Sequence, residues 1–135
     1  MDIAMDIAQL SQKSLPPFAK LLGLTIVEAT PERVVGELLV REELSNGVGA
    51  LHGGVAMSIA DTLGAVATMV NLKGQGGTTT MESKTNFVAP GLVGSKVRAE
   101  TTPVHRGKRT HVWQTRITTP EGKLVALVTQ TQMVL

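Results

Sequence analysis

The sequence lacks several residue types on which common protein chemistries depend. None of its 135 residues is cysteine or tyrosine, and only Phe18, Phe87 and Trp113 are aromatic. The absence of cysteine excludes disulfide scaffolds, thiol nucleophiles and cysteine-ligated zinc, and it fits a reducing compartment such as the cytoplasm. The shortage of aromatic rings argues against a surface on which nucleic-acid bases stack.

Signals for export or membrane insertion are also missing. The segment of residues 1–8 is acidic and has no basic region, so we do not expect a signal peptide. The most apolar run, residues 54–70, has 17 residues and carries Asp61 near its middle. A membrane helix needs about 20 apolar residues, and an aspartate at its centre costs about 2.5–3.5 kcal/mol. We therefore expect a cytoplasmic protein in which this run is a buried helix.

A hydrophobic core and an uneven distribution of charge are present. Hydrophobic residues make up 42% of the chain, and its length suits one domain, 1–135, with residues 1–20 as an N-terminal extension. Residues 96–135 hold seven basic and two acidic side chains, whereas the first 95 residues hold six basic and nine acidic ones. A basic final third predicts an anionic partner, and a short patch poor in aromatic rings favours a small anion over nucleic acid.

The hydrophobic pattern predicts two helical segments and six strands. A short helix over residues 4–22 is interrupted by Pro16-Pro17, and a long helix over residues 53–72 ends at Lys73-Gly74. β-Rich stretches bounded by turn signals predict strands over residues 24–29, 33–40, 78–88, 95–106, 110–119 and 124–135. A sheet of about six strands with one long helix is an α+β layout.

The long helix has two contrasting faces. Steps of about 100° per residue gather one apolar stripe, which we expect to pack on the sheet: Val55, Ile59, Leu63, Val66 and Val70. The opposite side carries Asp61 among mostly small residues, namely Gly54, Met57, Gly64, Ala65 and Thr68. A lone acid on an uncharged face predicts a carboxylate in a partly dry cleft. The alternative is a solvated surface aspartate.

The start of the long helix, His52-Gly53-Gly54, suits an anion or oxyanion because its N–H groups and the helix dipole point outward. The alternative is that the glycines only let the loop turn and that His52 is a cap. Gly53 and Asp61 are eight residues apart, or about 12 Å along a helix. An oxyanion donor and a base must each lie about 3 Å from one carbonyl group. If both act, the site requires two copies of the chain.

The pattern of Asn46, His52-Gly53-Gly54 and Asp61, followed by four strands, resembles the hotdog-fold thioesterases. It is most similar to the phenylacetic acid degradation (PaaI-like) subfamily of the 4-hydroxybenzoyl-CoA thioesterase superfamily, over about residues 20–135. The resemblance implies an antiparallel sheet wrapped around the long helix, and homodimers that pair into homotetramers. It also implies hydrolysis of aryl- or medium/long-chain acyl-CoA without metal or other cofactor, CoA being part of the substrate.

The resemblance also assigns roles at the two ends of this pattern. At the helix start, Gly53 donates its N–H to the thioester carbonyl, with Gly54 beside it in the substrate site. Asn46 orients or polarises that region, and His52 lies near the leaving thiolate or holds the loop.

From the partner chain, Asp61 is implied to act as general base or nucleophile, with Thr62 in the pocket. Ser83 matches a family serine that positions water. On its predicted strand, Ser83 shares a face with Met81, Thr85 and Phe87. A purely structural serine is the alternative.

The turn that holds Arg106, Lys108 and Arg109 fits the 3′-phosphate and pyrophosphate of coenzyme A, since Arg and Lys bind phosphate oxygens well. The alternative is a solvated hairpin turn. Two other functions stay open: a non-catalytic acyl-CoA-binding or regulatory domain, and a hydratase with a His/Asp pair. No histidine lies within the long helix, which disfavours the hydratase.

Overall fold

The computed structural model describes residues 3–135, with side chains from Ile7 onward. Its helices are α1 (Ile3–Lys13), α2 (Pro17–Leu22), the 3-10 turn η1 (Glu42–Leu44) and α3 (Gly53–Leu72). Its strands are β1 (Thr25–Thr30), β2 (Arg33–Leu39), β3 (Thr78–Phe87), β4 (Lys96–Arg106), β5 (Thr110–Thr118) and β6 (Leu124–Val134). The predicted α+β layout is confirmed, and the ends of the predicted strands differ by one residue at most. The 3-10 turn was not predicted.

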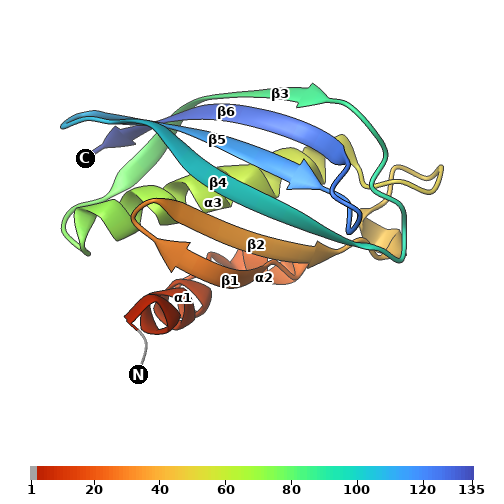
Figure 1. Cartoon of the computed structure of the whole chain (residues 1–135), viewed down its shortest axis with the longest axis horizontal. Coiled ribbons are helices and arrows are strands. Elements are labelled where there is room, and N and C mark those ends of the chain that lie inside the picture. The colour runs from red at the N-terminus through yellow and green to blue at the C-terminus, as the bar shows by residue number, and fades with distance from the viewer. Residues whose placement is uncertain (1–2) are drawn as a thin grey trace.

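The six strands form one antiparallel sheet in the order β1-β2-β4-β5-β6-β3. The sheet curves around α3, and α1 lies beside β1 at one edge (Figure 1). The predicted break between the first two helices occurs at the two prolines, because Pro16 takes an extended conformation and Pro17 occupies the first helical position of α2.

The face of α3 that packs on the sheet differs from the predicted stripe. Ile59 and Leu63 are buried as expected, but Val55, Val66 and Val70 are only partly buried at the margin of the core. The other buried positions are mostly small: Ala56, Ala60, Gly64, Ala67 and Thr68. Bulky side chains from the sheet need this space: Trp113 Nε1 donates to Thr68 Oγ1 at 2.8 Å, and the Gln130 amide lies against Gly64. The helix is therefore rotated so that its small residues face the sheet.

Within residues 3–135, α3 is the one helix with the length and hydropathy of a membrane span. Seven of its residues are nonetheless buried, and it contacts every strand of the sheet. Its place is that of a core helix, as predicted for this run.

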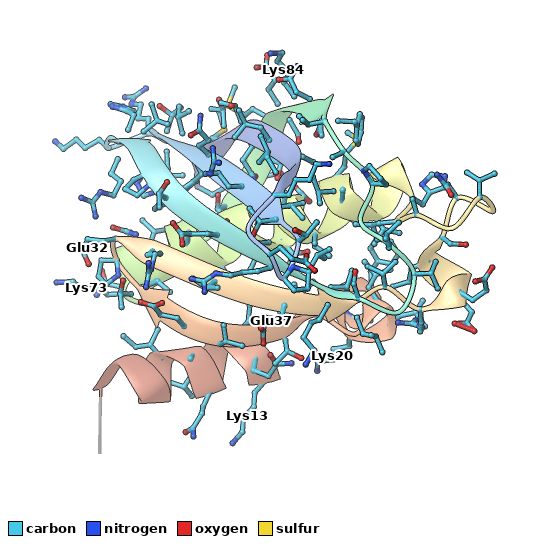
Figure 2. The ribbon with its side chains drawn as sticks, turned by 45° about the vertical axis from the view of Figure 1, so that its right-hand side comes forward. Lys13, Lys20, Glu32, Glu37, Lys73 and Lys84 are labelled. Carbon is cyan, nitrogen blue, oxygen red and sulfur yellow. The ribbon has the colours of Figure 1, made fainter. Side chains whose placement is uncertain are left out.

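The two edge strands of the sheet differ in what lies beside them. At β1, the side chain of Gln12 from α1 bonds the strand backbone: its Oε1 accepts from Ile26 N–H at 2.6 Å, and its Nε2 donates to the Leu24 carbonyl at 3.2 Å. At β3, the sheet ends with no described segment beyond it (Figure 1). Figure 2 shows Lys13 on α1 beyond one edge and Lys84 on β3 at the other. One edge is therefore covered and the other is open.

Candidate active site

The start of α3 leaves one backbone amide without an acceptor. His52 is the N-cap residue: its Nδ1 accepts from Gly54 N–H at 2.8 Å, and its carbonyl accepts from the N–H groups of Val55 and Ala56. No atom of residues 3–135 accepts a hydrogen bond from Gly53 N–H. The capping alternative for His52 is thus correct, and Gly54 has no amide to offer a ligand. Gly53 alone keeps a donor at the positive end of the helix dipole.

The Gly53 amide lies beside a cavity of about 410 Å³, lined by Asn46, Ala50, Leu51, Gly53, Ala56, Phe87, Val88, Ala89, Pro90 and Val125. The ring of Phe87 packs so closely on Gly53 that an added Cβ would meet its Cε1 at 2.9 Å. The Asn46 side chain folds its own loop, because Oδ1 accepts from the N–H groups of Val48 (2.9 Å) and Ala50 (3.3 Å). Asn46 therefore holds the loop that leads into the helix.

Asp61 lies in the middle of α3 and faces a second, larger cavity. This cavity has a volume of about 760 Å³ and is lined by α1 and α3: Ile7, Leu10, Ser11, Ser14, Pro16, Asp61, Thr62, Ala65, Val66, Met69, Val70, Lys73 and Gly74. Thr62 lines this cavity next to Asp61. Asp61 Oδ1 also accepts from Thr80 Oγ1 on β3 at 2.5 Å. The lone acid is therefore half-buried in a mostly apolar groove whose other polar residues are Ser11, Ser14, Thr62 and Lys73.

Thr80 is a contact of Asp61 that the sequence pattern did not predict, since strict alternation put Met81, and not Thr80, on the same face as Ser83. A β-bulge between Thr80 and Glu82 shifts the register. Thr80 consequently points to the inner face and Met81 is 56% exposed. The cause is the bulge, which the alternation of residues along a strand does not reveal.

Ser83 lies on the inner face of β3 with Thr85, whereas Met81, predicted to share this face, is displaced from it by the bulge. The Ser83 Oγ is buried and has no hydrogen-bond partner among the described residues, and the same holds for Thr85 Oγ1. A buried hydroxyl without a partner is costly, and it is a place where a ligand or water can bind. The structure thus brings Asn46, His52 and Gly53 together at one end of α3, and Asp61, Thr62 and Thr80 farther along it. Asn46 and Gly53 line the smaller cavity, and Asp61 and Thr62 line the larger one.

The predicted phosphate-binding turn lies between β4 and β5, at the C-terminal end of α3. Arg106 Nη1 donates to the Pro31 carbonyl at 3.0 Å and to Asn71 Oδ1 at 3.5 Å, so this guanidinium fastens the hairpin to the body of the protein. Glu32 and Lys73 mark the same end of the molecule in Figure 2. Lys108 and Arg109 stay exposed on the turn.

The electrostatics of this end are set by burial and by positive charge. Burial lowers the pKa of the nearby His111, and the positive charges of His105 and Arg106 lower it further. Among residues 3–135, no three His, Asp or Glu side chains gather as metal ligands would.

The chain matches known proteins over most of its length. The model of the family described as the thioesterase superfamily matches residues 48–126, which is more than half of the chain. The chain belongs to the thioesterase superfamily. Its relatives in this superfamily include the acyl-coenzyme A thioesterase PaaI of Escherichia coli, which is 33% identical over 81% of this chain and 76% of the relative. Human acyl-coenzyme A thioesterase 13 is 28% identical over 81% of this chain and 79% of the relative.

Solved structures of superfamily members share the fold. A thioesterase from Haemophilus influenzae superposes with a TM-score of 0.85 at 27% identity, covering 100% of this chain and 92% of the other. The PaaI protein of E. coli superposes with a TM-score of 0.83 at 25% identity, covering 99% and 96%. The predicted hotdog fold and the predicted PaaI-like resemblance are confirmed, and the protein is a thioester hydrolase.

Proposed function

We propose that this protein is an acyl-coenzyme A thioesterase for medium- or long-chain acyl groups, with active sites shared between two copies. The observation that carries the proposal is an amide without an acceptor, at Gly53, on the same helix as a carboxylate in an apolar groove, at Asp61. Thioester hydrolysis needs a donor for the carbonyl oxygen and a base or nucleophile at the carbonyl carbon. Relatives named acyl-coenzyme A thioesterase support CoA as the leaving group.

The proposed active unit is a dimer formed at the open edge of the sheet. Gly53 and Asp61 of one chain lie about 12 Å apart along α3, too far for both to reach one carbonyl group. An unpaired edge strand such as β3 readily pairs with the same strand of another chain. Two-fold symmetry would then bring Asp61 of one copy toward Gly53 of the other. Dimers would pair further into a homotetramer, as the resemblance implies.

In the proposed reaction, the thioester carbonyl oxygen accepts from Gly53 N–H. Asp61 of the partner subunit either takes a proton from the attacking water or attacks the carbonyl carbon itself, and Thr62 and Ser83 help place the acyl group and the water. The C–S bond then breaks, and the electron pair leaves with the CoA sulfur, which takes up a proton. Where water attacks, the free acid forms directly. Where Asp61 attacks, a water molecule then hydrolyses the mixed anhydride, which releases the acid and restores the carboxylate.

The capping hydrogen bond of His52 gives this residue a defined role in the proposal. Because Nδ1 accepts from Gly54 N–H, a neutral His52 carries its proton on Nε2. An Nε2–H group at the helix start is suited to stabilise the leaving thiolate. Asn46 supports this role by holding the preceding loop.

The acyl chain is assigned to the groove between α1 and α3. From Asp61 to Val70 the groove follows α3 over a rise of about 14 Å. Its apolar lining is aliphatic, from Ile7 and Leu10 on α1 to Met69 on α3, and includes no aromatic ring. A long aliphatic wall suits an alkyl chain better than a short aryl group.

The charged turn is assigned to the nucleotide of CoA. Lys108 and Arg109 are exposed and suit phosphate oxygens, whereas Arg106 is engaged with Pro31 and Asn71 and supports the turn. No separate cofactor is needed, and the absence of cysteine suits a cytoplasmic enzyme.

The proposal is tested by measuring free thiol released from a panel of acyl-CoA esters by wild type and by Asp61→Asn. We expect turnover that rises with aliphatic chain length up to a limit and exceeds that for aryl esters. Asp61→Asn should lower kcat by about 100-fold or more, because it removes the base or nucleophile, while substrate binding persists. Binding without turnover in wild type would identify a non-catalytic acyl-CoA-binding domain instead. Full turnover in Asp61→Asn would contradict the mechanism.

A further inference from the structure

A ring of hydrogen bonds closes behind Asp61. Gln130 Nε2 donates to the Ala60 carbonyl at 2.5 Å, and its Oε1 accepts from Gln132 Nε2 at 2.6 Å. Gln132 Nε2 also donates to Thr80 Oγ1 at 2.7 Å, and Thr80 Oγ1 donates to Asp61 Oδ1 at 2.5 Å. Because Ala60 and Asp61 are consecutive residues, the bonds return to the point on α3 from which they began.

The direction of every bond in this ring is fixed by one backbone carbonyl. The Ala60 carbonyl can only accept, so the NH₂ group of Gln130 must face it and the Gln130 oxygen must face Gln132. That oxygen requires a donor, so Gln132 presents its NH₂ group there and uses the second hydrogen for Thr80 Oγ1. The hydroxyl hydrogen of Thr80 is then left for Asp61, whose ionised carboxylate can only accept. Outside the ring, Thr78 Oγ1 lies 2.9 Å from both Gln132 Oε1 and the Met133 carbonyl oxygen, and these two acceptors share its one hydroxyl hydrogen.

Burying the side-chain amides of two glutamines in the core costs free energy that apolar side chains would not. Gln130 and Gln132 are 1% and 0% exposed, and they follow the apolar Ala126 and Val128 on the inner face of β6. Hydrophobic residues would satisfy the core without any need for partners. Gly64 makes room for this arrangement, because a Cβ at that position would overlap the Gln130 amide. Glycine inside a helix costs about 1 kcal/mol relative to alanine.

The bulge in β3 serves the same ring. It turns Thr80 inward, opposite Gln132, where regular alternation would present Met81. Three unusual features thus support the hydrogen bond to one oxygen of Asp61. They are the buried amides, the glycine in α3 and the bulge in β3. The other oxygen, Oδ2, accepts no hydrogen bond from the described residues.

We propose that Thr80, Gln132 and Gln130 are positioning residues that hold the Asp61 carboxylate in one rotamer, with Oδ1 engaged and Oδ2 presented to the reacting atom. The inference rests on the proposed role of Asp61 as base or nucleophile. Thr80 acts through Asp61 and needs no contact with the substrate. Misplacement of a reacting group by about 1 Å can lower the rate about 100-fold. Residues that hold the Asp61 carboxylate in place can therefore have a large effect on kcat.

The test compares Thr80→Val, which removes the hydroxyl while keeping the shape, with Thr80→Ser, which keeps the hydroxyl. We expect Thr80→Val to lower kcat by about 10- to 100-fold with little change in KM, and Thr80→Ser to restore kcat to within a few-fold of wild type. Thr131→Val is the matched control. Thr131 lies between Gln130 and Gln132 on β6, but its side chain is on the opposite face of the sheet and has no part in the ring, so this variant should keep wild-type kcat.

A double-mutant cycle distinguishes positioning from a structural role. If Thr80 acts through Asp61, adding Thr80→Val to Asp61→Asn should cause no further loss of kcat. An equal loss in both backgrounds, or wild-type kcat in Thr80→Val, would overturn the inference. Since Asp61→Asn alone tests the proposed function, a large loss there beside a normal Thr80→Val would refute the ring and leave the thioesterase proposal intact.

The hydrogen-bond ring can also be tested in the wild-type protein, without any substitution. The side-chain amide hydrogens of Gln130 and Gln132 should exchange with solvent far more slowly than those of the exposed Gln75, as followed by NMR. Exchange of all three at the same rate would show that the ring does not persist in solution, and the inference would fail.

Discussion

The two edges of the sheet have similar local structure but different surroundings. Each edge strand has a β-bulge with an exposed apolar residue, Val27 in β1 and Met81 in β3. Beside β1, the helix α1 packs and its Gln12 bonds the strand backbone, whereas among residues 3–135 nothing lies beyond β3. Natural proteins rarely leave a long edge strand uncovered. The chain completes one edge itself, and under the proposed function a second copy would complete the other.

The candidate site is found at the open edge. Thr80, Ser83 and Phe87 all belong to β3, and they contact or lie near the two halves of the proposed site on α3. The covered edge has no comparable set of polar groups without partners among the described residues. Under the proposed function, β3 therefore supports the catalytic groups of α3 and also forms the contact between two copies. Changes at the two edges should have different consequences.

The largest expected effect is at Gly53, beside the open edge. Gly53→Pro removes the amide hydrogen, yet proline is favoured at the first position of a helix, and His52 already has the extended conformation that must precede it. We expect kcat to fall by about 100- to 1,000-fold, the usual loss for one oxyanion donor. Gly53→Ala is the control, because it makes a similar contact with Phe87 but keeps the amide. Equal losses of kcat in the two variants would point to crowding at Phe87 instead of a lost donor.

A lysine placed at each bulge tests the comparison between the edges directly. Met81→Lys should weaken the dimer at least about tenfold, which corresponds to about 1.4 kcal/mol, because it puts an unpaired charge in the proposed interface. Val27→Lys, at the covered edge, should leave the dimer unchanged. Sedimentation of both variants over a range of concentrations measures the effect. If only Val27→Lys dissociates the dimer, the interface lies at the covered β1 edge, and the proposed dimer is contradicted.

The smallest effect is expected from the contact that covers β1. Gln12→Ala leaves the Ile26 N–H and the Leu24 carbonyl without their partner, so the free energy of unfolding should fall by about 1 kcal/mol. Activity per folded molecule should stay at the wild-type level. Urea denaturation measures the loss, with Gln9→Ala on the exposed side of α1 as control. If the two variants have the same stability, the Gln12 bonds do not contribute to this edge.

Sequence reasoning predicted the elements of the fold and much of the candidate site. The long helix was located because an apolar run starts at two glycines and stops at Lys73-Gly74, and these signals are local. Gly53 and Asp61 were singled out for the same reason: one begins the helix, and the other is the lone acid on its face. Only the rise per residue of a helix was needed to calculate the distance between them.

Features that depend on contacts between elements could not be predicted in this way. The rotation of α3, which buries Gly64 and Thr68, follows from the Gln130 and Trp113 side chains on distant strands. The inward position of Thr80 follows from a bulge that the residue types around it do not signal. For His52 the sequence left the capping role and the functional role open, because the capping bond that leaves Gly53 as the available donor depends on one side-chain rotamer.

The central claim is that each active site takes Gly53 from one copy and Asp61 from the other. It is tested most directly by mixing Gly53→Pro with Asp61→Asn, allowing subunits to exchange, and measuring thiol release while native mass spectrometry records the mixed dimers. Each mixed dimer has one intact site, so full exchange of equal amounts should restore about a quarter of wild-type activity. If mixed dimers form and activity stays at the level of the separate variants, both groups act within one chain and the shared site is wrong.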